Sequence, residues 1–269
     1  MNKFLNQTWI NIKRIILRNK RFVLFDVLMP ITFYVLFTKA MPMMDRGSWA
    51  RDFLISMIIY ANLLESIITV ANNLTTDKAG GFLTFVTLSE RSKAYYYASM
   101  GIVFWILNLL STALVLVVGI LTSGIKFTGA ELSYLIVILP LTCVPLVLLG
   151  IICSMVGDNN ASSGMANVIV FPMAMISGLW WPISEMPSWL QKIGELMPTY
   201  AIQKMANQAL KQQFAGGQLV SILIWTIALI FVIMLVNRFW GTRDTTIWET
   251  SINNIFLFHP GSGGRLIIG

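Results

Sequence analysis

The side chains best suited to chemistry in this chain lie within an apolar segment. Six polar residues, one of them a carboxylic acid, recur there at short intervals: Asn62, Glu65, Ser66, Thr69, Asn72 and Asn73. At 100° per residue they fall within an arc of roughly 120° on one helix. This polar stripe suits the binding of another molecule, or hydrogen bonds between helices that contribute about 0.6–2 kcal/mol each. The sequence leaves both roles open.

Motifs that carry out reactions are absent from the sequence. His259 is the only histidine, so histidine proton relays and metal triads have no residues to form them. Cys143 and Cys153 are about 15 Å apart along one predicted helix and cannot form a disulfide with each other. No Gly-Lys dipeptide occurs, which excludes a phosphate-binding P-loop. We therefore expect no catalytic residue, no metal ligand and no directly bound cofactor, and the chain is not expected to be an enzyme.

Long apolar segments must position the stripe. Of the 269 residues, 56% are hydrophobic, and the mean hydropathy is +0.72. A helix needs about 20 apolar residues to cross a hydrocarbon core of about 30 Å. Segments of that length occur at 22–41, 53–74, 97–121, 132–156, 163–181 and 219–237. The predicted fold class is therefore all-α: a polytopic membrane protein with six transmembrane helices.

The net charge of +7 is distributed unevenly along the chain. If the N-terminus is cytoplasmic, the inner segments hold most of the basic residues, and this bias places both termini in the cytoplasm. A basic surface that faces anionic lipid explains the charge, so nucleic-acid binding is not expected. Asp26, near the start of the first apolar segment, is expected to pair with Arg18 or Arg21. Residues 1–20 predict an interfacial amphipathic helix, with these residues on its apolar side: Phe4, Leu5, Trp9, Ile12, Ile15 and Ile16.

Two connections between the apolar segments differ from ordinary loops. Residues 75–93 are polar at both ends but apolar in the middle, which predicts a short helix on the inner rim that contacts a partner protein or only lipid. Residues 177–217 place Gly178, Pro182 and Pro198 among recurring aromatic and apolar side chains. We expect a re-entrant helix pair in the outer leaflet, or an aromatic belt with no further role.

Residues 177–200 resemble a known family, the membrane subunits of ABC-2 type exporters. The sequence SGLWWPISEMPSWL at 177–190, followed by MPTY at 197–200, is similar to the family pattern of Gly, then Pro, then Met-Pro-x-Trp-Leu, then Pro-x-x-Tyr. The inner connection departs from the family form: it begins with TTDK at 75–78 and lacks a proline near its end. The resemblance covers a predicted transmembrane domain at 1–240. Residues 241–269 are expected to be a tail that is disordered or not native to the protein.

The resemblance implies an ATP-driven exporter in the bacterial inner membrane. Its cargo would be an amphipathic or hydrophobic drug, lipid or peptide. Two permease subunits, identical or homologous, would work with two ABC ATPase subunits, which bind the ATP and Mg²⁺. The implied ATPase-coupling residues are Gly81, Phe82, Leu83, Phe85, Val86 and Glu90, and the stripe would form the translocation path. The implied outer re-entrant gate comprises Trp180, Trp181, Pro182, Trp189 and Leu190.

Three other kinds of protein remain as alternatives. A polytopic scaffold that transports nothing would have the same apolar segments. An intramembrane lipid-modifying enzyme normally needs clustered Asp, His or Arg at one depth, and this sequence supplies no such cluster. A small channel would need a second charged ring within the spans. An ATPase that copurifies with the chain would distinguish an exporter from a scaffold.

Overall fold

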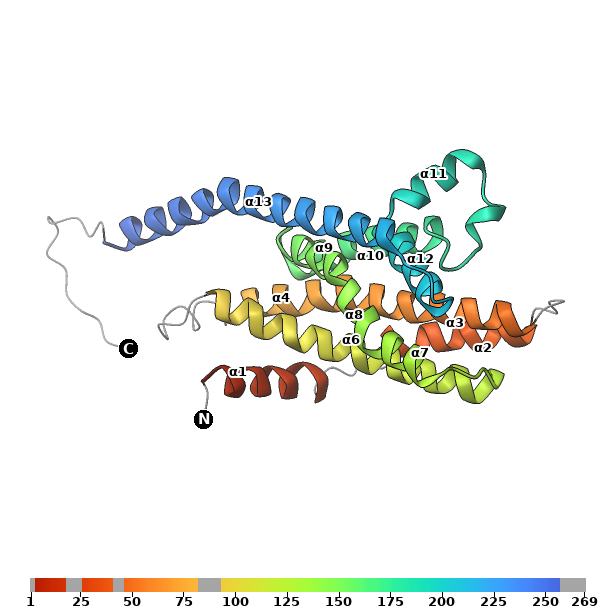
Figure 1. The fold of residues 1–269 in the computed structure, drawn as a ribbon. Coiled ribbons are helices and arrows are strands. Elements are labelled where there is room, and N and C mark those ends of the chain that lie inside the picture. Colours follow the sequence, from red (N-terminus) through yellow and green to blue (C-terminus); the bar gives the residue numbers. More distant parts are fainter. Residues whose placement is uncertain (1–2, 18–25, 41–45, 82–92, 257–269) are drawn as a thin grey trace, which may run out of the picture. The chain divides into compact units, whose positions relative to one another are not determined.

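The computed structural model describes residues 3–17, 26–40, 46–81 and 93–256. All regular elements in these ranges are helices, and the ranges contain no strand (Figure 1). The predicted all-α class is therefore confirmed for the described part of the chain.

Most of the helices carry the labels of Figure 1. They are α1 (Lys3–Ile12), α2 (Leu28–Ala40), α3 (Arg46–Leu64), α4 (Val70–Ala79), α6 (Lys93–Ser123), α7 (Gly129–Ser133), α8 (Leu139–Thr142), α9 (Val144–Ser154), α10 (Asn159–Ile176), α11 (Ser188–Leu196), α12 (Pro198–Leu210) and α13 (Gly216–Phe256). Wider π-helical turns occur at Lys13–Leu17, Glu65–Thr69 and Tyr134–Ile138, and a 3₁₀ turn at Ile183–Glu185.

Four helical stretches of the described chain are long and apolar enough to cross a membrane. They are Ser48–Ala79, Ala98–Ser123, Gly129–Ser154 and Gly216–Val236, and they match the second, third, fourth and sixth predicted spans. The first predicted span contains α2, a shorter apolar helix, and residues 22–25 and 41 of this span lie outside the described part of the chain. The fifth corresponds to α10, which begins with polar residues and ends at Ile176, just before Gly178 turns the chain with a φ of +85°.

The centre of the bundle is one long rod made of α3, the π-helical turn Glu65–Thr69 and α4 (Figure 1). Helices α2, α6, α9, α10 and α12 pack around it. Leu54, Met57, Ile58, Ile59 and Leu63 of α3 are fully buried and form the core. The polar stripe of the rod would be unfavourable in contact with lipid, and nearly all of the apolar stretch of the rod is buried, so the rod occupies the middle.

The chain divides into two units, residues 1–227 and 228–269. Within the first unit, α1 packs along α6, and the side chain of Asn11 donates a hydrogen bond of 2.9 Å to Ser99. The second unit continues α13 as far as Phe256. The helix thus extends past residue 240, where the sequence predicted a tail, and residues 257–269 lie outside the described part of the chain.

Candidate functional site

The polar stripe divides into two groups at the π-helical turn. The first group, Asn62, Glu65 and Ser66, is fully buried and faces α6. Ser111 on α6 donates a hydrogen bond of 2.8 Å to Oε2 of Glu65. Asn62 pairs with Thr112 at 3.2 Å, and Ser66 with Asn108 at 3.2–3.3 Å. These contacts join the rod to α6. Of the two roles that the sequence left open for the stripe, this group has that of hydrogen bonding between helices.

One oxygen of this buried group has no partner. Oε1 of Glu65 is buried and receives no hydrogen bond from the described chain, although Oε2 is bonded to Ser111. A buried acceptor without a donor is unfavourable by about 1–3 kcal/mol. Ser111 is therefore the main polar support of the Glu65 carboxyl group.

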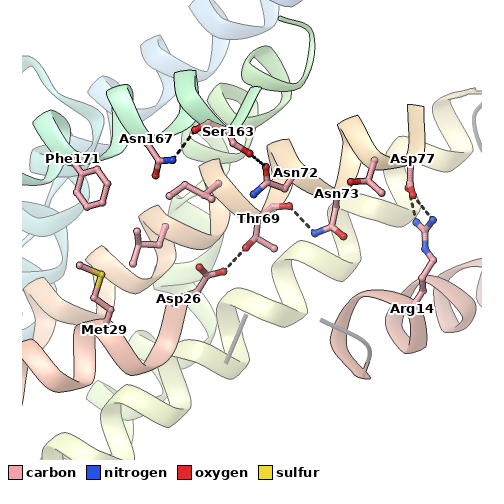
Figure 2. Close-up of a pocket in the computed structure, with 13 residues that line it drawn as sticks. Arg14, Asp26, Met29, Thr69, Asn72, Asn73, Asp77, Ser163, Asn167 and Phe171 are labelled. Atoms are coloured by element: carbon pink, nitrogen blue, oxygen red, sulfur yellow. Dashed lines mark hydrogen bonds and ion pairs between the residues drawn. The ribbon is translucent and has the colours of Figure 1, made fainter. Parts of the chain in front are cut away.

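The second group, Thr69, Asn72 and Asn73, lines a cavity of about 940 Å³ (Figure 2). Asn73 donates a hydrogen bond of 2.7 Å to the backbone oxygen of Thr69. The hydroxyl of Ser163 on α10 donates to the side-chain oxygen of Asn72, and so links the two sides of the cavity. We call this cavity the cleft.

The cleft has a polar end and an apolar end. Figure 2 shows Arg14 and Asp77 at one side of the view and Met29 and Phe171 at the other. Asn72, Asn73, Ser163 and Asn167 supply amides and hydroxyls between them, and Leu64 and Ile68 add apolar wall. Such a lining matches a molecule that has a polar head and an apolar body.

Arg14 and Asp77 form an ion pair at the polar end of the cleft. The guanidinium contacts both carboxylate oxygens, and Nη2 lies 2.6 Å from Oδ2. The hydroxyl of Tyr96 on α6 also donates to Asp77. The turn after α1 is thereby fastened to α4 only a few residues before Gly80 and Gly81.

Asp26, just before α2, also lines the cleft and is only 3% exposed. Its carboxyl group accepts a hydrogen bond from the hydroxyl of Thr69. Thr69 is thus its partner among the described residues. Arg18 and Arg21, the predicted partners, lie outside the described residues.

The residues predicted for the outer gate differ in their burial. Trp180 packs into the bundle, with ring centroids 5.7 Å from Phe33 and 5.3 Å from Tyr60. Trp181 and Trp189, by contrast, are 52% and 63% exposed. Pro182 is exposed and Leu190 is half-buried.

Trp189 and Leu190 lie in α11, which packs against α12, so a pair of helices occurs where the proline positions predicted one. Gly194 allows α11 to approach the end of α10, since a Cβ atom at this position would lie only 2.2 Å from the backbone oxygen of Ile176. The indole nitrogen of Trp225 donates a hydrogen bond of 2.8 Å to the backbone oxygen of Leu196. The pair is therefore held by two contacts, one with the end of α10 and one with Trp225 of α13.

Comparison with known proteins identifies the family to which the chain belongs. The family model described as ABC-2 type transporter matches residues 5–211. The chain belongs to the ABC-2 type transporter family. This permease is 27% identical over 202 residues to a Bacillus subtilis (strain 168) protein named "Putative transport permease YvfS", a match that covers 74% of the permease and 82% of the relative. No solved structure matches the permease.

Family membership, together with the four long apolar helices, makes the chain a multi-pass membrane permease rather than an enzyme. Of the residues predicted to couple it to an ATPase, the structure describes only Gly81, which follows α4 with a φ of +69°. The others lie outside the described residues: Phe82, Leu83, Phe85, Val86 and Glu90.

Sequence reasoning missed several residues of the permease's cleft. Arg14, Asp77, Ser163, Asn167 and Phe171 were not singled out, and they join the cleft from separate segments. One signal was available for the ion pair: the sequence predicted both Arg14 and Asp77 on the inner side with opposite charges. The other residues carried no comparable signal.

Proposed function

We propose that this permease is the membrane-spanning subunit of an ATP-driven exporter that moves an amphipathic or hydrophobic cargo, such as a drug, lipid or peptide, out of the cytoplasm. The observation that carries the proposal is the cleft of about 940 Å³, whose lining changes from an ion pair and amides to Met29 and Phe171. In this proposal the chain crosses the bacterial inner membrane six times, with both termini in the cytoplasm. Helices α11 and α12 re-enter the outer leaflet.

The cargo path of this proposal uses only part of the polar stripe. Thr69, Asn72 and Asn73 line the cleft and are the side chains placed to contact a cargo. Asn62, Glu65 and Ser66 are buried against α6, so their role is to hold the rod in place. The cleft-lining group is therefore the one in which substitutions alter cargo selection.

Two ABC ATPase subunits would supply the energy, and would bind the ATP and Mg²⁺. The segment Gly81–Glu90, with Phe82, Leu83, Phe85 and Val86 as its large side chains, would contact an ATPase. ATPase closure shifts the permease only if this contact differs between two states. The Arg14–Asp77 ion pair supports the proposal, because it ties α1 to the same end of α4.

A second permease subunit, identical or homologous, would complete the exporter. The exposed apolar side chains Val168 and Met175 on α10 offer a surface for that subunit or for lipid. Trp180, Trp181, Pro182, Trp189 and Leu190 would form the outer gate. Trp180 would anchor the gate, because it alone among the three tryptophans packs into the bundle.

Copurification and reconstitution test this function. Isolation of the full chain from its native host is expected to recover a P-loop ATPase. In vesicles that contain both proteins, Phe82→Asp or Phe85→Asp should abolish export while ATP hydrolysis continues. Phe214→Asp is the matched control, because Phe214 is 90% exposed on the predicted outer side. Export that survives in the Phe82 and Phe85 variants would rule out this coupling contact.

A further inference from the structure

The charges that line the cleft do not balance. Among the described side chains, the charged ones are Arg14, Asp26 and Asp77. Arg14 is already engaged by Asp77, which also accepts the hydrogen bond from Tyr96. Asp26 is left as an acidic group that no basic side chain of the described chain neutralises.

The surroundings of Asp26 make an unpaired negative charge on its carboxyl group energetically unfavourable. Asp26 is almost completely buried, and its partner is the neutral hydroxyl of Thr69. A second carboxylic acid, Glu65, lies on the rod one turn before Thr69. An ionised carboxylate within a membrane bundle is unfavourable unless it is paired, so this part of the cleft favours a positive charge from outside the chain.

The neighbouring walls suit the rest of a cationic amphiphile. Figure 2 shows Asp26 on the same side as Met29 and Phe171, away from Arg14. An aromatic ring and a thioether are favourable neighbours for an organic cation and for the alkyl groups that it carries. The side-chain oxygens of Asn72 and Asn167 are acceptors that can bind the N–H groups of an ammonium or guanidinium cation.

We infer that the cleft selects cargo that carries an organic cation, with the positive group beside Asp26 and the apolar body along Met29 and Phe171. This inference rests on the proposed function, which it deepens by naming the class of cargo. A neutral or anionic amphiphile would leave the Asp26 carboxylate unpaired, and would bind less well for that reason.

Two matched probes test the inference. Each is a dansyl-labelled alkyl chain; one ends in trimethylammonium and the other in tert-butyl, which has the same shape without the charge. Binding is measured by dansyl fluorescence to the full-length permease in nanodiscs of uncharged phosphatidylcholine. The wild type should bind the ammonium probe about tenfold more tightly. Equal binding of the two probes by the wild type overturns the inference, and this test needs no variant.

Three substitutions test whether Asp26 causes the preference for the ammonium probe. Asp26→Asn should reduce the preference to less than about twofold, and Asp26→Glu should retain most of it. Glu195→Gln is the control: it makes the same change of charge at an exposed position of α11 and should leave the preference intact. A preference that persists in Asp26→Asn also overturns the inference.

ATP-dependent uptake separates this inference from the proposed function. Both probes are offered to vesicles that hold the permease and its copurified ATPase. If both probes are transported equally and bound equally, the exporter function stands and the cation preference fails. If the ammonium probe is bound through Asp26 but neither probe is transported, the preference stands and the exporter function fails.

Discussion

The guanidinium of Arg14 holds both carboxylate oxygens of Asp77, 63 positions further along the chain. Asp77 is close to the end of α4, and Arg14 lies in the π-helical turn that follows α1. The side chain of Asp77 is only 8% exposed, so its carboxylate is largely shielded from water, whereas the Arg14 side chain is 27% exposed. It forms a fixed connection between two segments that the proposed function places next to the ATPase.

Removal of the negative charge of Asp77 should destabilise the permease. We expect Asp77→Asn to lower the free energy of unfolding by about 1–3 kcal/mol, because Arg14 loses its charged partner. Titration with SDS in mixed micelles, followed by circular dichroism, measures this change. The exchanged double variant Arg14→Asp/Asp77→Arg should recover part of the loss. A double variant no more stable than Asp77→Asn would indicate that the pair itself contributes little.

Removal of the Ser111 hydroxyl should weaken the contact between the rod and α6. Ser111→Ala leaves the buried Glu65 carboxyl group without its hydrogen-bond donor in the described chain, which should lower the unfolding free energy by about 1–3 kcal/mol. Thr122→Ala on the same helix is the control, since that exposed hydroxyl bonds only to backbone oxygens. The two variants should differ by at least about 1 kcal/mol in the same SDS titration.

A methyl group at position 150 should force α9 away from the rod. A Cβ atom on Gly150 would lie 2.3 Å from the backbone oxygen of Ser66 and 2.9 Å from Cβ of Val70. We expect Gly150→Ala to reduce the unfolding free energy by about 1–3 kcal/mol. Gly101→Ala meets no atom within 4 Å and should be neutral or stabilising by up to about 1 kcal/mol. Thermal unfolding in detergent compares them, and equal melting temperatures would contradict the close contact.

Two tryptophans of the predicted gate should respond differently to truncation. Trp180→Ala leaves a void beside Phe33 and Tyr60, and should lower the unfolding free energy by about 3 kcal/mol. Trp189→Ala removes an exposed ring and should change it by less than about 0.5 kcal/mol. If SDS titration shows equal losses, the division of the gate into an anchored and a surface tryptophan is wrong.

The sequence predicted the features that local rules determine. Bilayer thickness sets the length of a spanning helix, and the four long apolar helices appear where their hydropathy places them. Gly178 and Pro182 mark the break before the α11–α12 pair, because backbone conformation is a local property. The stripe was also recognised as polar on one helix.

Features that depend on distant segments were not predictable from one sequence. Ser163 bonds to Asn72 across 91 positions, and Thr69 bonds to Asp26 across 43. Neither pair has a periodic pattern that would reveal it. The predicted ion pair of Asp26 with Arg18 or Arg21 stays a prediction, because both arginines lie outside the described residues, and the described partner, Thr69, comes from another helix. The extension of α13 to Phe256 was missed because its polar composition resembles that of a tail.

The wide turn at Glu65–Thr69 acts as a phase shift in the rod. A π-helical turn holds about one residue more than an α-helical turn, so every later side chain lags by roughly 100°. In an uninterrupted α-helix Asn72, seven residues after Glu65, would lie on the Glu65 face; the shift turns it toward α10, where Ser163 bonds to it. Loss of one codon within the turn would remove the extra residue and leave the later helix in its present orientation, because the missing residue offsets the lost lag. An added codon in α4 would instead rotate every later side chain of the rod by roughly 100° and turn Asn72 and Asn73 off the wall that they now form.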